Sequence, residues 1–327
     1  MNRKLKTWAH SWPMKEPFVI ARGSQTTAEV AVVELESEGC IGRGEAAGVP
    51  YRGETPDSLM REIERVRPAI EAGADRDELL RLLPAGGARN VLDAALWDLE
   101  AKLTGLRAWQ RAGMDHGAAV ISAVTIGIRP IEAYERAARA LADHPWIKIK
   151  VDRTDPVAAV SAVRRAAPVS RLVVDANQAW SIADLKTFGP VMAQLGVDLL
   201  EQPVDKSLDE GLAGIDCPVP LCADESVHTL ADLPRLLGRY SFVNIKLDKT
   251  GGLTAALQLA HAARKAGLRL MSGCMAGGSL AMAPAMVLGQ LCEINDLDGP
   301  LLQAEDWPGG IVYQRGVMSP PWPAFWG

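Results

Sequence analysis

The chain has 327 residues, of which 48% are hydrophobic and 23% are charged, and it carries a formal net charge of −5. This composition indicates a soluble globular protein, and the small negative charge without Lys/Arg runs predicts neither nucleic acid nor a membrane surface as a partner. The five cysteines show no CxxC spacing, which argues against a disulfide framework or a zinc site and favours a reducing cytoplasm. We find no apolar core of signal-peptide type and no apolar run long enough to span a membrane.

The first third of the chain predicts an α+β domain. Residues 29–37 alternate as a β-strand does, and glycines follow at the spacing of a hairpin. Residues 56–73 and 88–105 then show helical periodicity. Strands followed by helices are typical of an α+β domain, which we expect over residues 1–117. The Pro/Trp-rich tail, residues 301–327, is expected to pack back on it.

From residue 118 to 300 the pattern changes to alternating strands and helices. The predicted strands end in polar residues at intervals that suit one strand, one helix and two loops. We therefore expect a modified (β/α)8 TIM-type barrel, of the (β/α)7β kind, with an α+β capping domain. Such a barrel gathers the C-terminal ends of its strands at one active-site face. The clearest runs are WIKIKV (146–151), RLVVDAN (171–177), DLLEQP (198–203), PLCADES (220–226), FVNIKL (242–247) and EINDLDG (293–299).

Three acidic residues end consecutive predicted strands: Asp175, Glu201 and Asp224. Three carboxylates that converge on one point repel one another unless a cation lies between them. Oxygen ligands without a nearby histidine or cysteine favour Mg²⁺ over zinc. The alternative is that the three acids are solvated loop residues.

The lysines form a second pattern. Lys148 and Lys150 alternate with isoleucines, so both point to the same side of their strand. Two ammonium groups inside a barrel lower each other's pKa, and a lysine near neutrality can act as a general base. Lys246 has a similar place on the sixth strand, opposite the second. Lys150 and Lys246 therefore predict two bases on either side of one carbon, unless they are surface lysines.

The motifs KIK, DANQ, EQP, ADES, NIKLDKTGG and DLDGP together resemble those of the enolase superfamily, in its muconate-lactonizing-enzyme-like subgroup. Within it the chain is most similar to the dipeptide epimerases, including those acting on L-Ala-D/L-Glu in murein peptide recycling. The resemblance spans nearly the whole chain, because PFVIARGSQTTAEV and ARNVLDAALWDLEAK also resemble the capping domain of that family.

The resemblance implies a role for each motif. Asp175, Glu201 and Asp224 would ligate Mg²⁺, and Lys150 and Lys246 would move the Cα proton of the second residue of a dipeptide through a metal-stabilised enolate. Enolase-superfamily sites in general combine a lysine or histidine base with Mg²⁺. The product would be the epimer, which makes the protein an isomerase.

The resemblance also implies substrate contacts. Lys148 would lie beside the substrate carboxylate, and Thr125 and Cys274 would contact the substrate, although Cys274 can equally be a buried thiol. Asp296 and Asp298 point to the same face of the eighth strand and would hold the α-ammonium group of the dipeptide. We expect this pair to have no protein cation of its own. The alternative for the DLDG run is a turn with local hydrogen bonds.

Two loops of the capping domain are expected to close over the barrel mouth. Arg22 lies in the first and could form a bidentate pair with a side-chain carboxylate of the substrate, or be an ordinary solvated arginine. Tyr51 and Arg52 lie in the second. The sequence does not decide which of the three sets specificity.

Two other classes of function share part of this pattern. An o-succinylbenzoate synthase, an N-acylamino-acid racemase or a cycloisomerase would keep the lysines and acids but bind a substrate without an ammonium group. A catalytically silent barrel would act as a binding protein. The expected partner is a small dipeptide, and the sequence is compatible with a homo-oligomer without specifying one.

Overall fold

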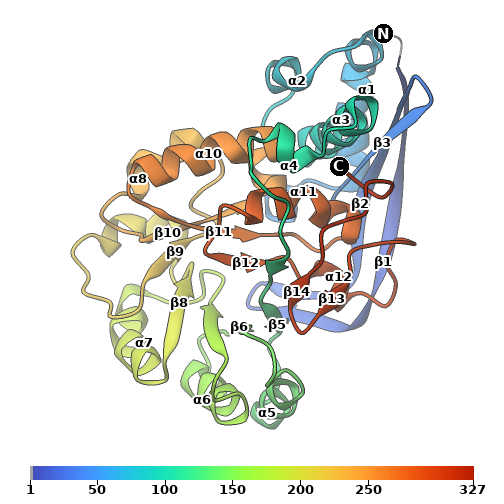
Figure 1. Cartoon of the computed structure of the whole chain (residues 1–327). Helices are drawn as coiled ribbons and strands as arrows, with labels where there is room; N and C mark the ends of the chain where they lie inside the picture. Colours follow the sequence, from blue (N-terminus) through green and yellow to red (C-terminus); the bar gives the residue numbers. More distant parts are fainter. Residues whose placement is uncertain (1–2) are drawn as a thin grey trace.

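The computed structural model describes residues 3–327 (Figure 1). The first three strands along the chain form an antiparallel sheet. It consists of β1 (Lys4–Ile20), β2 (Gly23–Ser37) and β3 (Cys40–Ala46), in that order. Glu38 and Gly39 both have positive φ, 50° and 77°, as the two-residue turn of a tight hairpin requires. The predicted hairpin is therefore confirmed, and β1 is an additional strand that we did not predict.

Three helices cover this sheet: α1 (Pro56–Ala72), α2 (Arg76–Leu82) and α3 (Gly87–Thr104). The first and third confirm the two predicted helices. The α3 helix lies so close to β3 that a Cβ at Gly42 would be 2.2 Å from the carbonyl oxygen of Ala95. Glycine is required there because any side chain would collide with the helix backbone.

Eight parallel strands form the barrel, and each is hydrogen-bonded to the next along the chain. The backbone N–H of Ala123, beside the first strand, donates to the carbonyl of Asn295 in the last at 2.7 Å, which joins the two edges. The predicted barrel is confirmed. Its strands are β5 (Val124–Ile126), β6 (Trp146–Lys150), β7 (Arg171–Asp175), β8 (Val197–Glu201), β9 (Leu221–Ala223), β10 (Phe242–Lys246), β11 (Arg269–Gly273) and β12 (Ile294–Asp296).

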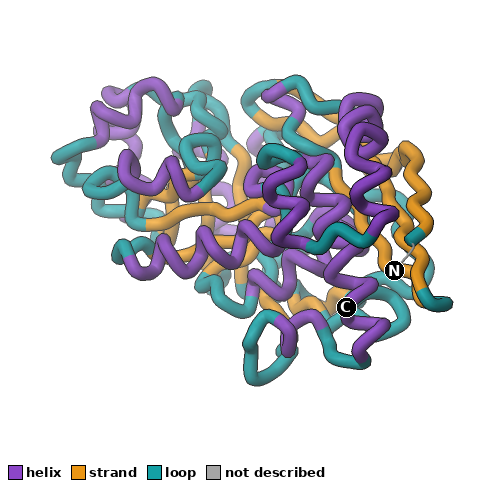
Figure 2. Tube along the Cα trace, turned by 90° about the horizontal axis from the view of Figure 1, so that it is seen from above, coloured by secondary structure: helices purple, strands orange, loops and turns teal. Residues whose placement is uncertain are grey.

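Helical segments connect the strands, and the antiparallel strands lie to one side of the barrel when it is seen from above (Figure 2). The connections around β9 contain 3₁₀ turns and one short helix in place of full helices. The connecting segments are α5 (Ile131–Ala140), α6 (Pro156–Ala166), α7 (Ile182–Gln194), η2 (Lys206–Leu212), η3 (Leu230–Asp232), α8 (Leu233–Leu236), α9 (Leu247–Thr250), α10 (Leu253–Lys265) and α11 (Ser279–Gly289).

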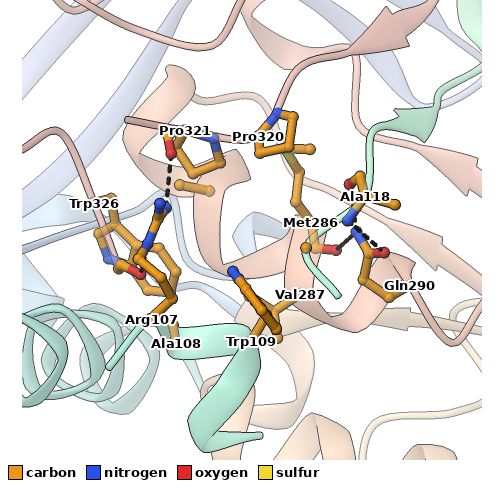
Figure 3. Close-up of a pocket in the computed structure, with 13 residues that line it drawn as sticks. Arg107, Ala108, Trp109, Ala118, Met286, Val287, Gln290, Pro320, Pro321 and Trp326 are labelled. Atoms are coloured by element: carbon orange, nitrogen blue, oxygen red, sulfur yellow. Dashed lines mark hydrogen bonds between the residues drawn. The ribbon is translucent and has the colours of Figure 1, made fainter. Parts of the chain in front are cut away.

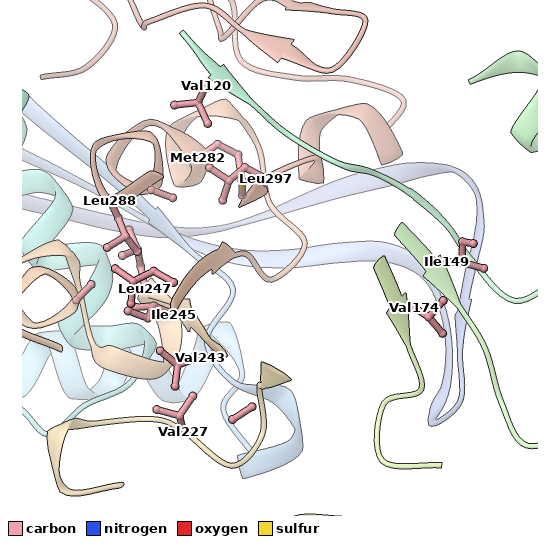
Figure 4. Close-up of a cluster of buried hydrophobic side chains, with 14 of the residues drawn as sticks. Val120, Ile149, Val174, Val227, Val243, Ile245, Leu247, Met282, Leu288 and Leu297 are labelled. Carbon is pink, nitrogen blue, oxygen red and sulfur yellow. The ribbon is translucent and has the colours of Figure 1, made fainter. Parts of the chain in front are cut away.

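Apolar side chains fill the barrel from the N-terminal part of its strands. This inner cluster contains Ala123, Trp146, Val173, Leu199, Cys222, Phe242, Met271 and Ile294. Side chains of the opposite face, such as Ile149, Val174 and Ile245, belong to the larger cluster between strands and helices, part of which Figure 4 shows. Because successive residues of a strand alternate between its faces, the C-terminal ends of the strands are left to present polar side chains at the barrel mouth.

The end of the chain contacts both parts of the molecule. The hairpin of β13 (Tyr313–Gln314) and β14 (Val317–Met318) pairs with β4 (Val120–Ile121). Further on, the indole of Trp326 donates to the carbonyl of Ala94 in α3 at 3.2 Å. The remaining short elements are η1 (Pro50–Arg52), α4 (Ala108–Arg111) and α12 (Gly299–Leu302).

A crevice of about 20 Å³ remains between α4, α11 and the tail (Figure 3). The guanidinium of Arg107 donates there to the carbonyls of Pro321 and Gly327, both below 2.8 Å. These bonds attach the tail to the body of the protein. Within residues 3–327, no helix combines the length and the apolar character needed to cross a bilayer.

Candidate active site

The charged residues at the strand ends form one buried rim. Lys150 is in register with Asp175, and Asp175 with Glu201, so the ends of β6, β7 and β8 bring these three side by side. Asp224 directly follows β9, and Lys246 ends β10. All five side chains belong to buried residues. The structure thus brings together the acids and lysines that the sequence placed at strand ends.

Lys148 lies at the centre of this rim. Its ammonium nitrogen is 2.7 Å from Oδ2 of Asp296, 2.7 Å from Oε2 of Glu201 and 3.0 Å from Oδ2 of Asp175. Burial by itself would lower the pKa of Lys148, but these carboxylates raise it well above its ordinary value. Our expectation that neighbouring ammonium groups lower each other's pKa is therefore wrong for Lys148, because its carboxylate neighbours dominate.

The other two predicted lysines each bind one acid. Nζ of Lys150 is 2.6 Å from Oδ2 of Asp175, and Nζ of Lys246 is 2.7 Å from Oδ2 of Asp224. Burial would lower the pKa of Lys246, but Asp224 and Glu201 raise it. Three strands, β7 to β9, separate β6 from β10 on one side of the barrel and three, β11, β12 and β5, on the other. The two lysines therefore start from opposite sides of the barrel.

The three acids differ in their ionisation. Burial raises the pKa of Glu201 to about 7, and the negative charge of Asp175 contributes. Burial acts in the same direction on Asp175 and Asp224, but adjacent lysines lower the pKa of both below the ordinary value. Two of the three carboxylates are thus held ionised by lysines.

Lys249 is a fourth lysine in the site, and our sequence reasoning missed it. Its ammonium group lies 2.6 Å from Oδ1 of Asp224 and donates to the backbone carbonyls of Asp224 and Asn244. Burial lowers the pKa of Lys249. The signal was present, because Lys249 follows Lys246 by three residues and α9 returns its side chain to the same region.

Backbone and amide groups hold the acids in place. The amide of Asn244 donates to Oε1 of Glu201 at 2.8 Å, and the backbone N–H of Asn177 donates to Oδ1 of Asp175 at 2.8 Å. The side-chain oxygen of Gln202 accepts from the backbone N–H of Asp224 at 2.8 Å. None of these three was predicted, although DANQ, EQP and VNIKL contain them.

Asp175, Glu201 and Asp224 fit a hard divalent cation by their chemistry. All three are carboxylates that supply oxygen donors, and they stand at the C-terminal ends of three adjacent strands, β7, β8 and β9. In residues 3–327 no three such side chains surround a common point closely enough to enclose an ion. The ammonium group of Lys148 instead lies between Asp175 and Glu201.

Asp296 and Asp298 lie together at the end of β12 and the start of α12. The backbone N–H of Thr125 donates to Oδ2 of Asp298 at 2.6 Å, and its hydroxyl lies 3.3 Å from Oδ1 of Asp296. Burial, followed by the charge of Asp296, raises the pKa of Asp298 to about 7. The expectation that the pair has no protein cation is wrong for Asp296, which binds Lys148 at 2.7 Å.

The two loops from the antiparallel domain reach the segment after β9. Arg22 forms an ion pair with the buried carboxylate of Glu225, and its guanidinium lies 5.1 Å from the centre of the Tyr51 ring. Tyr51 and Arg52 contact opposite ring nitrogens of His228, at 3.3 and 3.2 Å. Arg22 is thus neither free nor fully solvated, and Glu225 is a partner that we did not predict.

Cys274 follows β11 and is half-buried. Burial raises its pKa well above the ordinary value, and the nearby carboxylates of Asp296 and Asp298 act in the same direction. The thiol therefore stays protonated near neutral pH, and Cys274 is unsuited to act as a nucleophile.

Replacing Lys249 with methionine should lower the free energy of unfolding by about 3–5 kcal/mol, because the change removes one partner of a buried ion pair. Oδ1 of Asp224 and two carbonyl oxygens would lose their donor. Chemical denaturation of both proteins at pH 7 measures the difference. Lys186→Met, at an exposed position on α7, is the matched control. A loss below 1 kcal/mol for Lys249→Met would show that the pair contributes little.

Family models match both parts of the chain. Residues 132–321 match the enolase C-terminal domain-like model, and residues 2–113 match the N-terminal domain model of mandelate racemase / muconate lactonizing enzyme. L-Ala-D/L-Glu epimerase of Escherichia coli (strain K12) is 43% identical, and the alignment covers 97% of this chain and 99% of the relative. N-acetyl-D-glutamate racemase of a Pseudoalteromonas species is 46% identical over 87% of this chain and 91% of that protein.

Two solved structures have the same architecture. One is an enolase family member from Agrobacterium tumefaciens with homology to dipeptide epimerases, with bound sodium and L-Ala-L-Glu. It is 39% identical in sequence and has a TM-score of 0.97, and the superposition covers 99% of this chain and 100% of the other. The other is a dipeptide epimerase from Enterococcus faecalis complexed with Mg and L-Leu-L-Tyr, 27% identical, with 99% coverage of each chain and a TM-score of 0.92. This chain therefore belongs to the mandelate racemase / muconate lactonizing enzyme family of the enolase superfamily.

Proposed function

We propose that the protein is a Mg²⁺-dependent dipeptide epimerase that inverts the Cα of the second residue, with L-Ala-D/L-Glu as the best candidate substrate. The observation that carries the proposal is the placement of Lys150 and Lys246 on opposite strands of the barrel, with three buried carboxylates between them. The 43% identity to an L-Ala-D/L-Glu epimerase over nearly the whole chain supports it. The five free thiols, all among the described residues, suit the cytoplasm as its location.

The two lysines perform complementary steps. In the neutral form, one lysine accepts the Cα proton from its side of the substrate. The lysine on the other side, as an ammonium group, then donates a proton to the opposite face, and the Cα configuration is inverted. The reverse reaction exchanges the roles of Lys150 and Lys246, so one site interconverts both diastereomers.

Asp175, Glu201 and Asp224 would hold Mg²⁺ in this site. When bound, Mg²⁺ supplies positive charge that holds the substrate carboxylate and offsets the acids that raise the pKa of Lys246. Lys148, already in contact with two of the acids, adds a fixed positive charge near the substrate carboxylate. These positive charges favour the state in which the Cα proton has left.

Asp298 is the best-placed group for the substrate ammonium. Within residues 3–327 no lysine or arginine forms an ion pair with it, whereas Asp296 is paired with Lys148. An ammonium group beside Asp298 would therefore meet a carboxylate that has no other cationic partner. Thr125 fixes the direction of that carboxylate through its backbone N–H.

Racemisation of an N-acylamino acid is the second candidate function. The contact between Lys148 and Asp296 leaves one carboxylate of the pair already neutralised, which suits a substrate without an ammonium group. The 46% identity to an N-acetyl-D-glutamate racemase favours the same candidate. The two functions differ in the group that lies at Asp298.

Asp298→Asn distinguishes the two functions. For L-Ala-L-Glu we expect kcat/KM to fall roughly 30- to 5,000-fold, because the ammonium group loses a desolvated partner. This range corresponds to a loss of about 2–5 kcal/mol of transition-state stabilisation. For N-acetyl-L-glutamate the same change should have little effect. Proton exchange at Cα in D₂O, followed by NMR, measures both substrates.

Asp143→Asn, at an exposed position, is the matched control. The dipeptide epimerase assignment requires that the wild-type protein turn over L-Ala-L-Glu much faster than N-acetyl-L-glutamate. The opposite preference would assign the protein to the N-acylamino-acid racemases.

A further inference from the structure

A cavity of about 200 Å³ lies beside the Asp296/Asp298 pair, between the antiparallel domain and the barrel. Its lining residues are Met14, Lys15, Glu16, Phe18, Thr125, Arg129, Leu301 and Leu302. An apolar cavity of about 150 Å³ is large enough to hold benzene. The space therefore suits a medium-sized side chain.

Thr125 connects the cavity to the pair of aspartates. Thr125 lines it and at the same time binds both carboxylates, through its backbone N–H and its hydroxyl. Leu301 and Leu302 belong to α12, whose N-cap residue is Asp298. A substrate whose ammonium group binds Asp298 would therefore have its first residue next to Thr125 and α12, which both line this cavity.

An irregularity in β1 builds the far wall. The pairing of β1 with β2 shifts register between Pro13 and Phe18, which releases the intervening residues from the hairpin. Met14 instead forms an isolated bridge with Gln303, and the backbone N–H of Ala304 donates to the carbonyl of Pro13 at 2.7 Å. The bulged segment is therefore attached to the two residues that follow α12.

The charged residues of the lining are already bonded. Arg129 forms an ion pair with Glu16 at 2.7 Å, and Lys15 donates to the carbonyl of Leu301 at 2.9 Å. The surface left for a ligand is supplied by Met14, Phe18, Leu301 and Leu302, whose side chains are apolar. A cationic side chain would find Glu16 already paired with Arg129, and an anionic side chain would meet only the ammonium group of Lys15, which belongs to a solvent-exposed residue.

We propose that this cavity is the subsite for the side chain of the first residue of the dipeptide, and that it accepts apolar side chains as large as leucine or methionine. The inference rests on the proposed dipeptide epimerase function and extends it to the substrate class. One methylene more or less in an apolar pocket changes kcat/KM by about 10- to 200-fold. We therefore expect L-Leu-L-Glu to be at least as good a substrate as L-Ala-L-Glu.

Leu302→Trp, which fills the cavity, tests the subsite. The ratio of kcat/KM for L-Leu-L-Glu to that for L-Ala-L-Glu should fall at least about tenfold. Met14→Phe narrows the cavity from the opposite wall and should lower the same ratio of kcat/KM values. It serves as the test if Leu302→Trp does not fold. Leu237→Trp is the matched control, because Leu237 is exposed and precedes β10 at the other end of the barrel.

The outcomes separate the two proposals. An equal loss for both dipeptides would make the cavity an access route, and an unchanged ratio in both folded variants would exclude it from substrate binding. Either result overturns the subsite while leaving the epimerase assignment intact. A wild-type protein that turns over neither dipeptide would instead reject the proposed function.

Discussion

Replacing Lys246 with alanine should abolish interconversion of L-Ala-L-Glu and L-Ala-D-Glu while leaving Cα proton exchange for one of the two. A positioned acid or base contributes about 10²–10⁴-fold to a rate. The loss of epimerisation should reach the upper end of that range, because Lys150 starts from the opposite side of the barrel and cannot serve the same face. NMR in D₂O, with each diastereomer supplied separately, measures exchange and inversion independently.

Lys150→Ala is the reciprocal experiment. It should also stop inversion but retain exchange for the other diastereomer, so the two variants are matched to each other. Lys186→Ala, on the outer helix α7, controls for the loss of a lysine as such. Inversion of both diastereomers by Lys246→Ala at close to the wild-type rate would show that the two-lysine arrangement is wrong.

Removal of divalent cations with excess chelator should abolish turnover, and Mg²⁺ added back should restore it. Asp175, Glu201 and Asp224 are buried acids that would otherwise repel the carboxylate of the substrate. Calorimetric titration of the chelated protein with MgCl₂ gives a reading independent of activity. Asp224→Asn should weaken that binding, whereas Asp143→Asn should not.

Full activity in excess chelator would contradict the metal assignment. Restoration by Mg²⁺ that is equally efficient in Asp224→Asn would place the cation elsewhere. The stability of each variant, measured in chelator, separates a loss of metal binding from a loss of folding.

The positions of the site residues could be predicted because the strand pattern and the barrel topology are regular. Asp175, Glu201 and Asp224 follow apolar runs in sequence, and parallel strands bring their ends to one face. The partners of these residues could not be predicted in the same way. Lys148 reaches Asp296 because β5, β6 and β12 adjoin in the closed barrel, and no local pattern contains that relation.

Two other features escaped prediction for local reasons. Strand β1 carries Pro13 and a bulge, which interrupt the alternation that identifies a strand. Lys249 lies on a four-residue helix that begins immediately after β10. The strand pattern ends at Lys246, so it does not predict where the side chain of Lys249 lies. The pairing of Arg22 with Glu225 depends on how two domains pack.

The joining of the first and last barrel strands has a consequence for folding. Thr125 and Asp298 are 173 residues apart in sequence, and their hydrogen bond crosses the seam that the Ala123–Asn295 bond closes. Such non-local contacts form slowly, because a long loop must close before they can be made. A chain in which the strands from β6 to β10 have paired, but the seam has not, would already have its acids and lysines together but would lack the contacts of Thr125 with Asp296 and Asp298.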